Sequence, residues 1–494
     1  MDALKTIYEE QEKIMLISGI GALLHYDLAT AMPKDAYKDR AEQMRYLREL
    51  SDDILRGKRL GTAVAHLKSK MKKKDSLGNK DAVVLRELAK EVSRTKKLPP
   101  EFVSRLARQQ VIGQARWEEA RAKDDFSIFE PELKRWVGLK RKQAAYLSNG
   151  GPYDALIDLY EEGMTADRYS KIFSYLKPEL IRLLERIKSS SIYKRQKAIK
   201  LNVDRQDMDG LIEGLRKSMG IDTGRYLISR SSHPFTLMIS KDDVRTTTRY
   251  LHPLDSLYSA IHEMGHALYN LNLPKRYENT FVFDGASFGL HESQSILWEK
   301  LIGKSKFFWK GFYKRFEKAA KTGLSLEELH RQVCLVRPSF IRVDADDVTY
   351  VLHIILRFEI ERDLLKGKLK VKDAKHAWNR KMKEYLGLMP KTDNEGILQD
   401  IHWSMGEFGY FPSYALGNIY AAQLYKSLLK KTGIKEEIQG IEFSGCGAWL
   451  KSSFYRHGNS MKAEEIVRKA TGQGLSPEDY IGFLNEKYAR LYRL

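Results

Sequence analysis

The chain has 494 residues, of which 43% are hydrophobic and 30% are charged, and its formal net charge at pH 7 is +20. A chain of this size can bury a large core, and its dispersed charges exclude the stretch of roughly 18 apolar residues that a membrane span requires. Its two cysteines exclude a disulfide framework, so we predict a cytoplasmic protein.

The positive charge raises the question of nucleic-acid binding, and the sharpest basic cluster is Lys68–Lys74. Elsewhere Lys and Arg are spread along the chain and mixed with Asp and Glu. No zinc finger, RNP-type strand or basic zipper accompanies them. A solvated basic surface is therefore the favoured interpretation, and nucleic acid is not an expected partner.

Helices are predicted through almost the whole chain, because apolar residues recur at three- and four-residue spacing. No Gly/Ser-rich or Pro-rich linker divides the sequence. We therefore predict a single domain over residues 1–494, with about residues 1–150 as a possible N-terminal helical lid. The clearest helical patterns cover Ala166–Ser189, Ser325–Val336, Val348–Lys366 and Ala463–Thr471.

The stretch Arg225–Arg249 differs from its helical surroundings. It contains three short runs rich in β-branched and aromatic residues, which are Tyr226–Ser229, Phe235–Ser240 and Val244–Thr248. The predicted fold class is therefore all-α, with one small β-element near residues 225–249.

The next segment, Pro253–Asn270, predicts an amphipathic helix that carries a His-Glu-x-x-His pattern. His262 and His266 lie one turn apart on one flank of this helix, with Glu263 beside them. Two imidazoles in this arrangement bind zinc, and the neighbouring carboxylate can accept a proton from an attacking water. A chance match is the alternative, but Gly265 lies where a neighbouring backbone can approach, which favours a real site.

A catalytic zinc site needs a third protein ligand, which we expect from a second helix. The segment Gly285–Glu299 predicts such a helix, with Glu292 and Glu299 on one face. Glu292 is the favoured third ligand, and His291, which points about 100° away round the helix, is the alternative. Candidate acceptors for the other ring nitrogens of the histidine ligands are Asn270 and Asp284.

Six motifs then occur in a fixed order: His233-Pro234-Phe235, Asp243-Val-Arg245-Thr-Thr247, His262–His266, His291-Glu292-Ser293-Gln294, Ile341-Arg342-Val-Asp-Ala345-Asp346 and Gly396-Ile-Leu-Gln399-Asp400-Ile-His402-Trp403. On these motifs the chain resembles the thermostable carboxypeptidase (carboxypeptidase Taq) family of zinc metallocarboxypeptidases over almost its whole length. Two positions depart from the family: an N-terminal segment that usually begins with Trp-Asp reads Tyr26-Asp27, and a position often held by Asn is Lys300.

The resemblance implies a zincin-like helical fold with a deep active-site cleft, a homodimer, and removal of C-terminal residues from peptides with broad side-chain tolerance. It implies Zn²⁺ as the cofactor, with Co²⁺ able to substitute. Arg342 is the match for the cation that binds the terminal carboxylate, assisted by His402 and Tyr410, and His233 for the group that polarises the scissile carbonyl. The structural alternatives are an ion pair between Arg342 and Asp346, a core role for His402 and a passive His233.

Two other functions stay open at this point. The first is a zinc oligopeptidase that cuts peptides internally, which the matched Arg342 motif disfavours. The second is a basic helical nucleic-acid-binding protein with a vestigial metal site. The presence of Glu263 beside all three predicted ligands argues against a degraded site.

Overall fold

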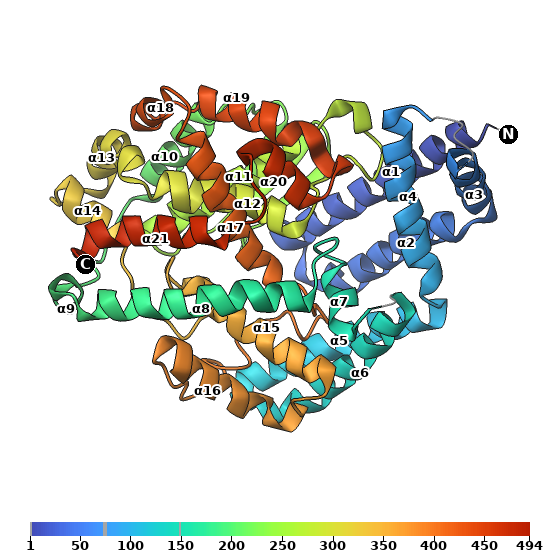
Figure 1. Ribbon diagram of the computed structural model, residues 1–494, viewed down its shortest axis with the longest axis horizontal. Coiled ribbons are helices and arrows are strands. Elements are labelled where there is room, and N and C mark those ends of the chain that lie inside the picture. Colours follow the sequence, from blue (N-terminus) through green and yellow to red (C-terminus); the bar gives the residue numbers. More distant parts are fainter. Residues whose placement is uncertain (1, 73–76, 148–149) are drawn as a thin grey trace. The chain divides into compact units, whose positions relative to one another are not determined.

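The computed structural model describes residues 2–72, 77–147 and 150–494. Helices dominate these residues, and a small three-stranded sheet accompanies them (Figure 1). The predicted fold class, all-α with one small β-element, is confirmed. Single-domain behaviour and an N-terminal lid stay predictions.

The chain divides into two compact units, each assembled from three segments. Unit 1 comprises Met1–Lys97, Lys200–Glu327 and Leu424–Gly474, and unit 2 comprises Leu98–Ile199, Glu328–Gln423 and Leu475–Leu494. The helices of unit 1 are α1 (Ala3–Thr30), α2 (Tyr37–Arg56), α3 (Lys58–Lys72), α4 (Asn79–Lys97), α10 (Arg205–Ser218), α11 (Pro253–Leu271), α12 (Phe288–Ile296), the π-helix η4 (Leu297–Gly303), α13 (Lys306–Ala320), α18 (Ile434–Gly440), α19 (Ser444–Ser453) and α20 (Ala463–Thr471). Those of unit 2 are α5 (Pro100–Lys123), α6 (Glu130–Leu147), α7 (Pro152–Ile157), α8 (Ala166–Ser189), α9 (Ser191–Arg195), α15 (Tyr350–Lys366), α16 (Ala374–Leu386) and α21 (Pro477–Tyr492), while α14 (Leu326–Val333) and α17 (Phe411–Leu428) contain residues of both units.

The predicted helical segments are close to the observed ones. Helices α8 and α20 have the predicted bounds, and α14 and α15 lie inside the predicted ranges. Of the basic cluster Lys68–Lys74, residues 68–72 are exposed at the end of α3, and residues 73 and 74 lie outside the described part. None of the described helices combines the length and apolar character that crossing a bilayer demands.

The sheet has the strand order β1-β3-β2. Strand β1 (Tyr226–Arg230) runs parallel to β3 (Asp243–Thr248), and β2 (Thr236–Ser240) runs antiparallel to it. The central strand β3 buries Val244 and the threonines that follow Arg245, and it packs against α11. A narrow sheet can stay stable when a helix covers one face, and here that helix carries the His-Glu-x-x-His pattern.

Helices α11 and α12 approach each other closely at Gly265. A Cβ atom built on Gly265 would lie 2.8 Å from both the Gln294 carbonyl oxygen and the Ser295 Cα. These are backbone atoms that cannot move aside cheaply, so only glycine permits this spacing. The close approach places the residues of α12 beside the two histidines of α11.

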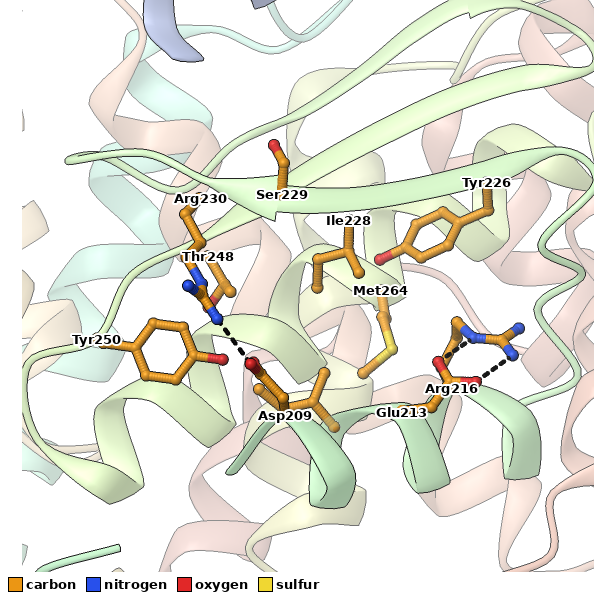
Figure 2. A pocket seen from close by; sticks show the side chains of 11 residues that line it. Asp209, Glu213, Arg216, Tyr226, Ile228, Ser229, Arg230, Thr248, Tyr250 and Met264 are labelled. Atoms are coloured by element: carbon orange, nitrogen blue, oxygen red, sulfur yellow. Dashed lines mark hydrogen bonds and ion pairs between the residues drawn. The ribbon is translucent and has the colours of Figure 1, made fainter. Parts of the chain in front are cut away.

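A cavity of about 510 Å³ lies in unit 1 between α10 and the sheet (Figure 2). Its charged side chains form ion pairs with one another: Arg230 with Asp209 at 2.6 Å, and Arg216 with Glu213 at 2.7 Å. Met264 of α11 also lines the cavity, but none of the predicted site residues does. The cavity is therefore separate from the candidate active site.

Candidate active site

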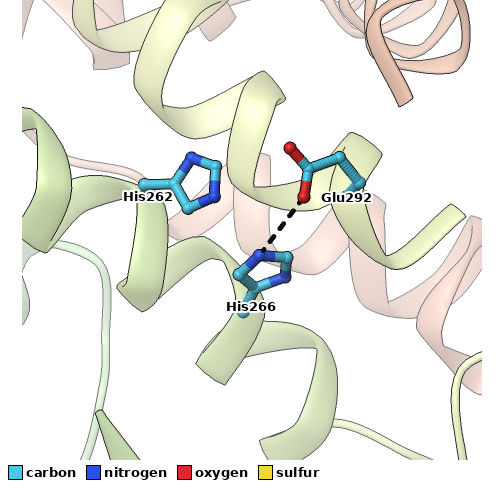
Figure 3. Close-up of side chains that lie close together, drawn as sticks. All are labelled: His262, His266 and Glu292. Atoms are coloured by element: carbon cyan, nitrogen blue, oxygen red, sulfur yellow. Dashed lines mark ion pairs between the residues drawn. The ribbon is translucent and has the colours of Figure 1, made fainter. Parts of the chain in front are cut away.

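The structure brings the three predicted metal ligands together, two from α11 and one from α12 (Figure 3). His262, His266 and Glu292 each offer one ligand atom, and these atoms all lie within 4.8 Å of one another. His266 Nε2 lies 3.7 Å from Glu292 Oε2. Two imidazole nitrogens and one carboxylate oxygen form the donor set of catalytic zinc sites, in which a fourth position stays open. The residues therefore fit a catalytic divalent metal ion.

Glu263, the predicted catalytic base, is buried on the same helix and is held by the sheet. Thr236 Oγ1, on the first residue of β2, donates a hydrogen bond of 2.6 Å to Glu263 Oε2. It also lies 3.1 Å from the Glu263 carbonyl oxygen. Burial raises the pKa of Glu263, which makes its carboxylate a stronger proton acceptor.

Both histidines have a partner at Nδ1. His262 Nδ1 lies 2.8 Å from Glu299 Oε2, and His266 Nδ1 lies 2.6 Å from His291 Nδ1. His291 Nε2 in turn lies 2.9 Å from Asn270 Oδ1. Asn270, a predicted acceptor, therefore acts through His291 and not on a ligand directly.

Asp284, the other predicted acceptor, accepts a hydrogen bond from the backbone of Gly285 at 2.7 Å. No hydrogen bond joins it to either histidine of α11 within the described residues. Its predicted role is therefore not supported.

The charges around His262 favour a positive charge at its imidazole ring. Burial lowers the pKa of His262, but the hydrogen bond to Glu299 and the charges of Glu292 and Glu263 outweigh burial and raise the pKa to about 9. Burial also opposes ionisation of Glu299, yet His262 and Lys304 bring its pKa down to about 2. Negative charge is thus concentrated around His262, whereas burial holds the pKa of His266 well below its ordinary value of 6.5, so His266 offers a neutral imidazole.

Arg342, the predicted carboxylate anchor, lies in unit 2 within a cluster of buried charges. Its Nε and Nη2 atoms lie 3.0 Å and 2.9 Å from Asp400 Oδ1, and Arg357 Nε lies 2.6 Å from Asp400 Oδ2. The alternative that Arg342 pairs with Asp346 is wrong, because Asp346 accepts hydrogen bonds from the backbone of Val348 and of the next residue. Burial alone would raise the pKa of Asp400, but the two guanidinium groups hold it well below its ordinary value of 3.8.

His402 lies beside this cluster with a buried ring whose Nδ1 has no hydrogen-bond partner among the described residues. Its Nε2 lies 3.4 Å from the Tyr414 hydroxyl, and its ring centroid lies 5.5 Å from that of Tyr410. Burial lowers the pKa of His402 to about 3, so the ring is neutral near pH 7. His402 is therefore a neutral ring beside the Arg342–Asp400 pair, and Tyr410 packs against it.

His233 is exposed in the loop between β1 and β2, three residues before Thr236. Its backbone carbonyl accepts a hydrogen bond from Ser231 Oγ. The structure gives its ring no hydrogen bond to a described residue, so a catalytic role for His233 stays a prediction.

Two residues of the site are not predicted by the sequence motifs. Thr236 has one signal in the sequence, which is its place directly after the His-Pro-Phe motif. The sequence places Glu299 on the same helix face as Glu292 but does not predict its contact with His262. It lies in the π-helix η4, a wide turn that is often associated with functional sites.

A His-Glu-x-x-His helix, a glutamate from a second helix and a supporting small sheet define a metallopeptidase of the zincin type. The chain belongs to the carboxypeptidase Taq (M32) metallopeptidase family, whose sequence profile matches residues 6–488. It is therefore a metallocarboxypeptidase, a hydrolase that acts on peptides.

Individual relatives agree with this assignment. Carboxypeptidase 1 of Bacillus subtilis is 34% identical over 501 residues, with 99% of each chain covered. Thermostable carboxypeptidase 1 of Pyrococcus furiosus is 35% identical over 496 residues, with 99% of this chain and 98% of the relative covered. The solved structure of an M32 carboxypeptidase from Deinococcus radiodurans R1 has a TM-score of 0.95 at 32% identity, with both chains covered completely.

Proposed function

We propose that the chain is a zinc carboxypeptidase in which His262, His266 and Glu292 hold the metal and Glu263 is the general base. The observation that carries this proposal is the convergence of the three ligand atoms within 4.8 Å, with Glu263 beside them on α11. Zn²⁺ suits two imidazoles and one carboxylate, and Co²⁺ accepts the same ligands and can substitute.

A metal ion held by these residues would act as a Lewis acid toward water and the scissile carbonyl. Glu263 accepts a proton from the attacking water and delivers it to the leaving amine. The Thr236 hydroxyl engages Glu263 Oε2, so the carboxylate keeps a fixed orientation and Oε1 is left for the proton. His233 is the proposed donor to the carbonyl oxygen as negative charge develops there.

Arg342 is the proposed anchor for the substrate's terminal carboxylate, with His402 and Tyr410 as further donors. Two arginines and one aspartate leave the cluster of Arg342, Arg357 and Asp400 with a net charge of +1 (2 − 1), which favours an added anion. The Nδ1 atom of His402 makes no hydrogen bond to a described residue and lies 3.9 Å from Asp400 Oδ1, so it can supply a neutral donor beside this charge. An enzyme that binds the one group common to all C-terminal residues can tolerate many side chains, so we propose broad specificity.

A homodimer and a cytoplasmic location, both predicted from the sequence, belong to the same proposal. The dimer rests on the resemblance to the family alone. The location rests on the low cysteine content of the sequence.

The test of the catalytic assignment is Glu263→Gln. An amide cannot accept the proton of water, so turnover should fall by roughly 10²–10⁴-fold while bound Zn²⁺ stays at the wild-type level. Mass spectrometry of an unstructured peptide with a free C-terminus measures the trimming, and metal analysis of the same protein measures Zn²⁺. Trimming by the variant at more than a few per cent of the wild-type rate would refute the role of Glu263.

A further inference from the structure

The two predicted histidine ligands are held by different kinds of partner. His262 Nδ1 faces a carboxylate oxygen of Glu299 at 2.8 Å. His266 Nδ1 faces the ring nitrogen Nδ1 of His291 at 2.6 Å. One predicted ligand is therefore supported by a carboxylate and the other by an imidazole ring.

The hydrogen-bond chain behind His266 determines where its protons lie. The Oδ1 atom of Asn270 can only accept, so His291 Nε2, 2.9 Å away, must carry a proton and donate it. A neutral His291 then accepts at Nδ1, and His266 must donate from its own Nδ1. This leaves the lone pair of His266 Nε2 free on the side of Glu292.

The same reasoning applies to His262. An ionised carboxylate has no proton to give, so His262 Nδ1 donates to Glu299 and Nε2 is the ring nitrogen left to exchange its proton for a metal. Glu299 is itself held by Lys304, whose Nζ lies 3.6 Å from Glu299 Oε1. These two residues are five apart, which is the spacing that a π-helix brings together, and both lie in or directly after η4.

We propose that Glu299 and the His291–Asn270 pair are the positioning residues of the metal centre, fixing both ligand histidines as Nδ1-protonated tautomers with Nε2 directed at the metal. The proposal rests on the proposed function, in which His262, His266 and Glu292 bind the metal. The same proposal makes His291 a partner of a ligand and not a ligand itself. Both of its ring nitrogens take part in hydrogen bonds, so neither remains for a metal ion.

The two supports should differ in strength. Glu299 adds a negative charge as well as an acceptor, whereas His291 adds an acceptor alone. Loss of an outer partner of a metal-bound histidine typically weakens metal binding by roughly 10–100-fold. We expect Glu299→Ala at the upper end of this range and His291→Ala at the lower end.

The experiment measures the dissociation constant of Zn²⁺ for the full chain by competition with a chelator, together with the visible absorption of the Co²⁺-loaded protein. Glu299→Gln keeps an acceptor oxygen and should recover part of the affinity lost in Glu299→Ala. Asn270→Asp keeps an acceptor and should bind Zn²⁺ more tightly than Asn270→Leu. Asp284→Asn is the matched control, because it changes a nearby carboxylate that accepts a hydrogen bond from Gly285 and makes none with the histidines of α11.

Affinity losses in Glu299→Ala and His291→Ala, a shifted Co²⁺ spectrum in both and an unchanged Asp284→Asn would support the proposal. If Glu292→Ala loses Zn²⁺ while Glu299→Ala and His291→Ala bind it within twofold of wild type, the positioning roles are wrong and the ligand set stands. If His291→Ala loses Zn²⁺ as completely as Glu292→Ala, His291 is a ligand and the proposal is overturned. If Glu292→Ala binds Zn²⁺ like the wild type, the proposed ligand set fails as well.

Discussion

The site on α11 and α12 in unit 1 and the arginine cluster in unit 2 both bury charge, but they leave opposite charges unbalanced. Around His262 and Glu299, the three carboxylates of Glu263, Glu292 and Glu299 outnumber the two nearby lysines, Lys300 and Lys304. In unit 2, two arginines share the single carboxylate of Asp400. Buried charges without an equal partner are costly, so each site favours an added ion of opposite sign. The first site fits a divalent metal, and the second is the proposed site for the carboxylate of a peptide.

The largest effect on stability is expected from Asp400→Ala, which removes the carboxylate that Arg342 and Arg357 share. Removing the shared carboxylate leaves two buried guanidinium groups facing each other, because Arg357 is fully buried and Arg342 nearly so. Loss of one partner of a buried ion pair typically costs about 3–5 kcal/mol. Urea unfolding of the purified variant should show this loss. Unchanged stability would mean that the two arginines are neutralised elsewhere.

A smaller loss of stability is expected from Gly265→Ala, which affects the site on α11 and α12. The added methyl group would press on the backbone of Gln294 and Ser295, and overpacking of this kind costs about 1–3 kcal/mol. Separation of α11 from α12 should also weaken Zn²⁺ binding. The matched control is Gly214→Ala on α10, where a Cβ atom meets nothing within 4 Å and the helix propensity improves. Equal stability and Zn²⁺ affinity in the two variants would show that the close approach at Gly265 is not required.

The smallest expected effect is a dependence of the free energy of unfolding on pH, which arises from the lowered pKa of Asp400. Because its folded-state pKa lies below the ordinary value of 3.8, its ionisation stabilises the fold above about pH 4. That contribution is lost as the pH falls below 3.8 toward the lower folded-state pKa. The difference in unfolding free energy between the wild type and Asp400→Asn should therefore shrink on acidification. A difference that grows toward low pH would contradict the assigned direction.

The residues of the site on α11 and α12 were more predictable from the sequence than those of the arginine cluster, and the reason is local geometry. His262, Glu263 and His266 lie on one helix, where spacing alone determines which side chains converge. Glu292 lies on the next helix in the chain. The partner of Arg342, in contrast, is 58 residues away at Asp400, and no periodic pattern joins the two.

Two further features depend on long-range packing or on an irregular turn. The chain divides into two units, each made of three separate segments. The composition does not predict this division, because no linker sequence marks the points where the chain passes from one unit to the other. The contact between Glu299 and His262 arises in a π-helix, whereas periodicity arguments assume the regular α-helix. The small sheet was predictable because β-branched or aromatic residues recur in each of its three strands.

We propose that Arg342, with the net positive charge of its cluster, binds the terminal carboxylate of the peptide substrate. The most direct test compares kcat/KM for a free peptide and its C-terminal amide, in the wild type and in Arg342→Ala. A charge-assisted hydrogen bond contributes about 1.5–3 kcal/mol, so each single change should lower kcat/KM by roughly 10- to 100-fold. Bound Zn²⁺ should stay constant.

The two changes remove opposite sides of one interaction, so their effects should not add. We predict that Arg342→Ala cleaves the amide no more slowly than the wild type does. Equal cleavage of free and amidated peptides by the wild type would contradict this account of substrate binding.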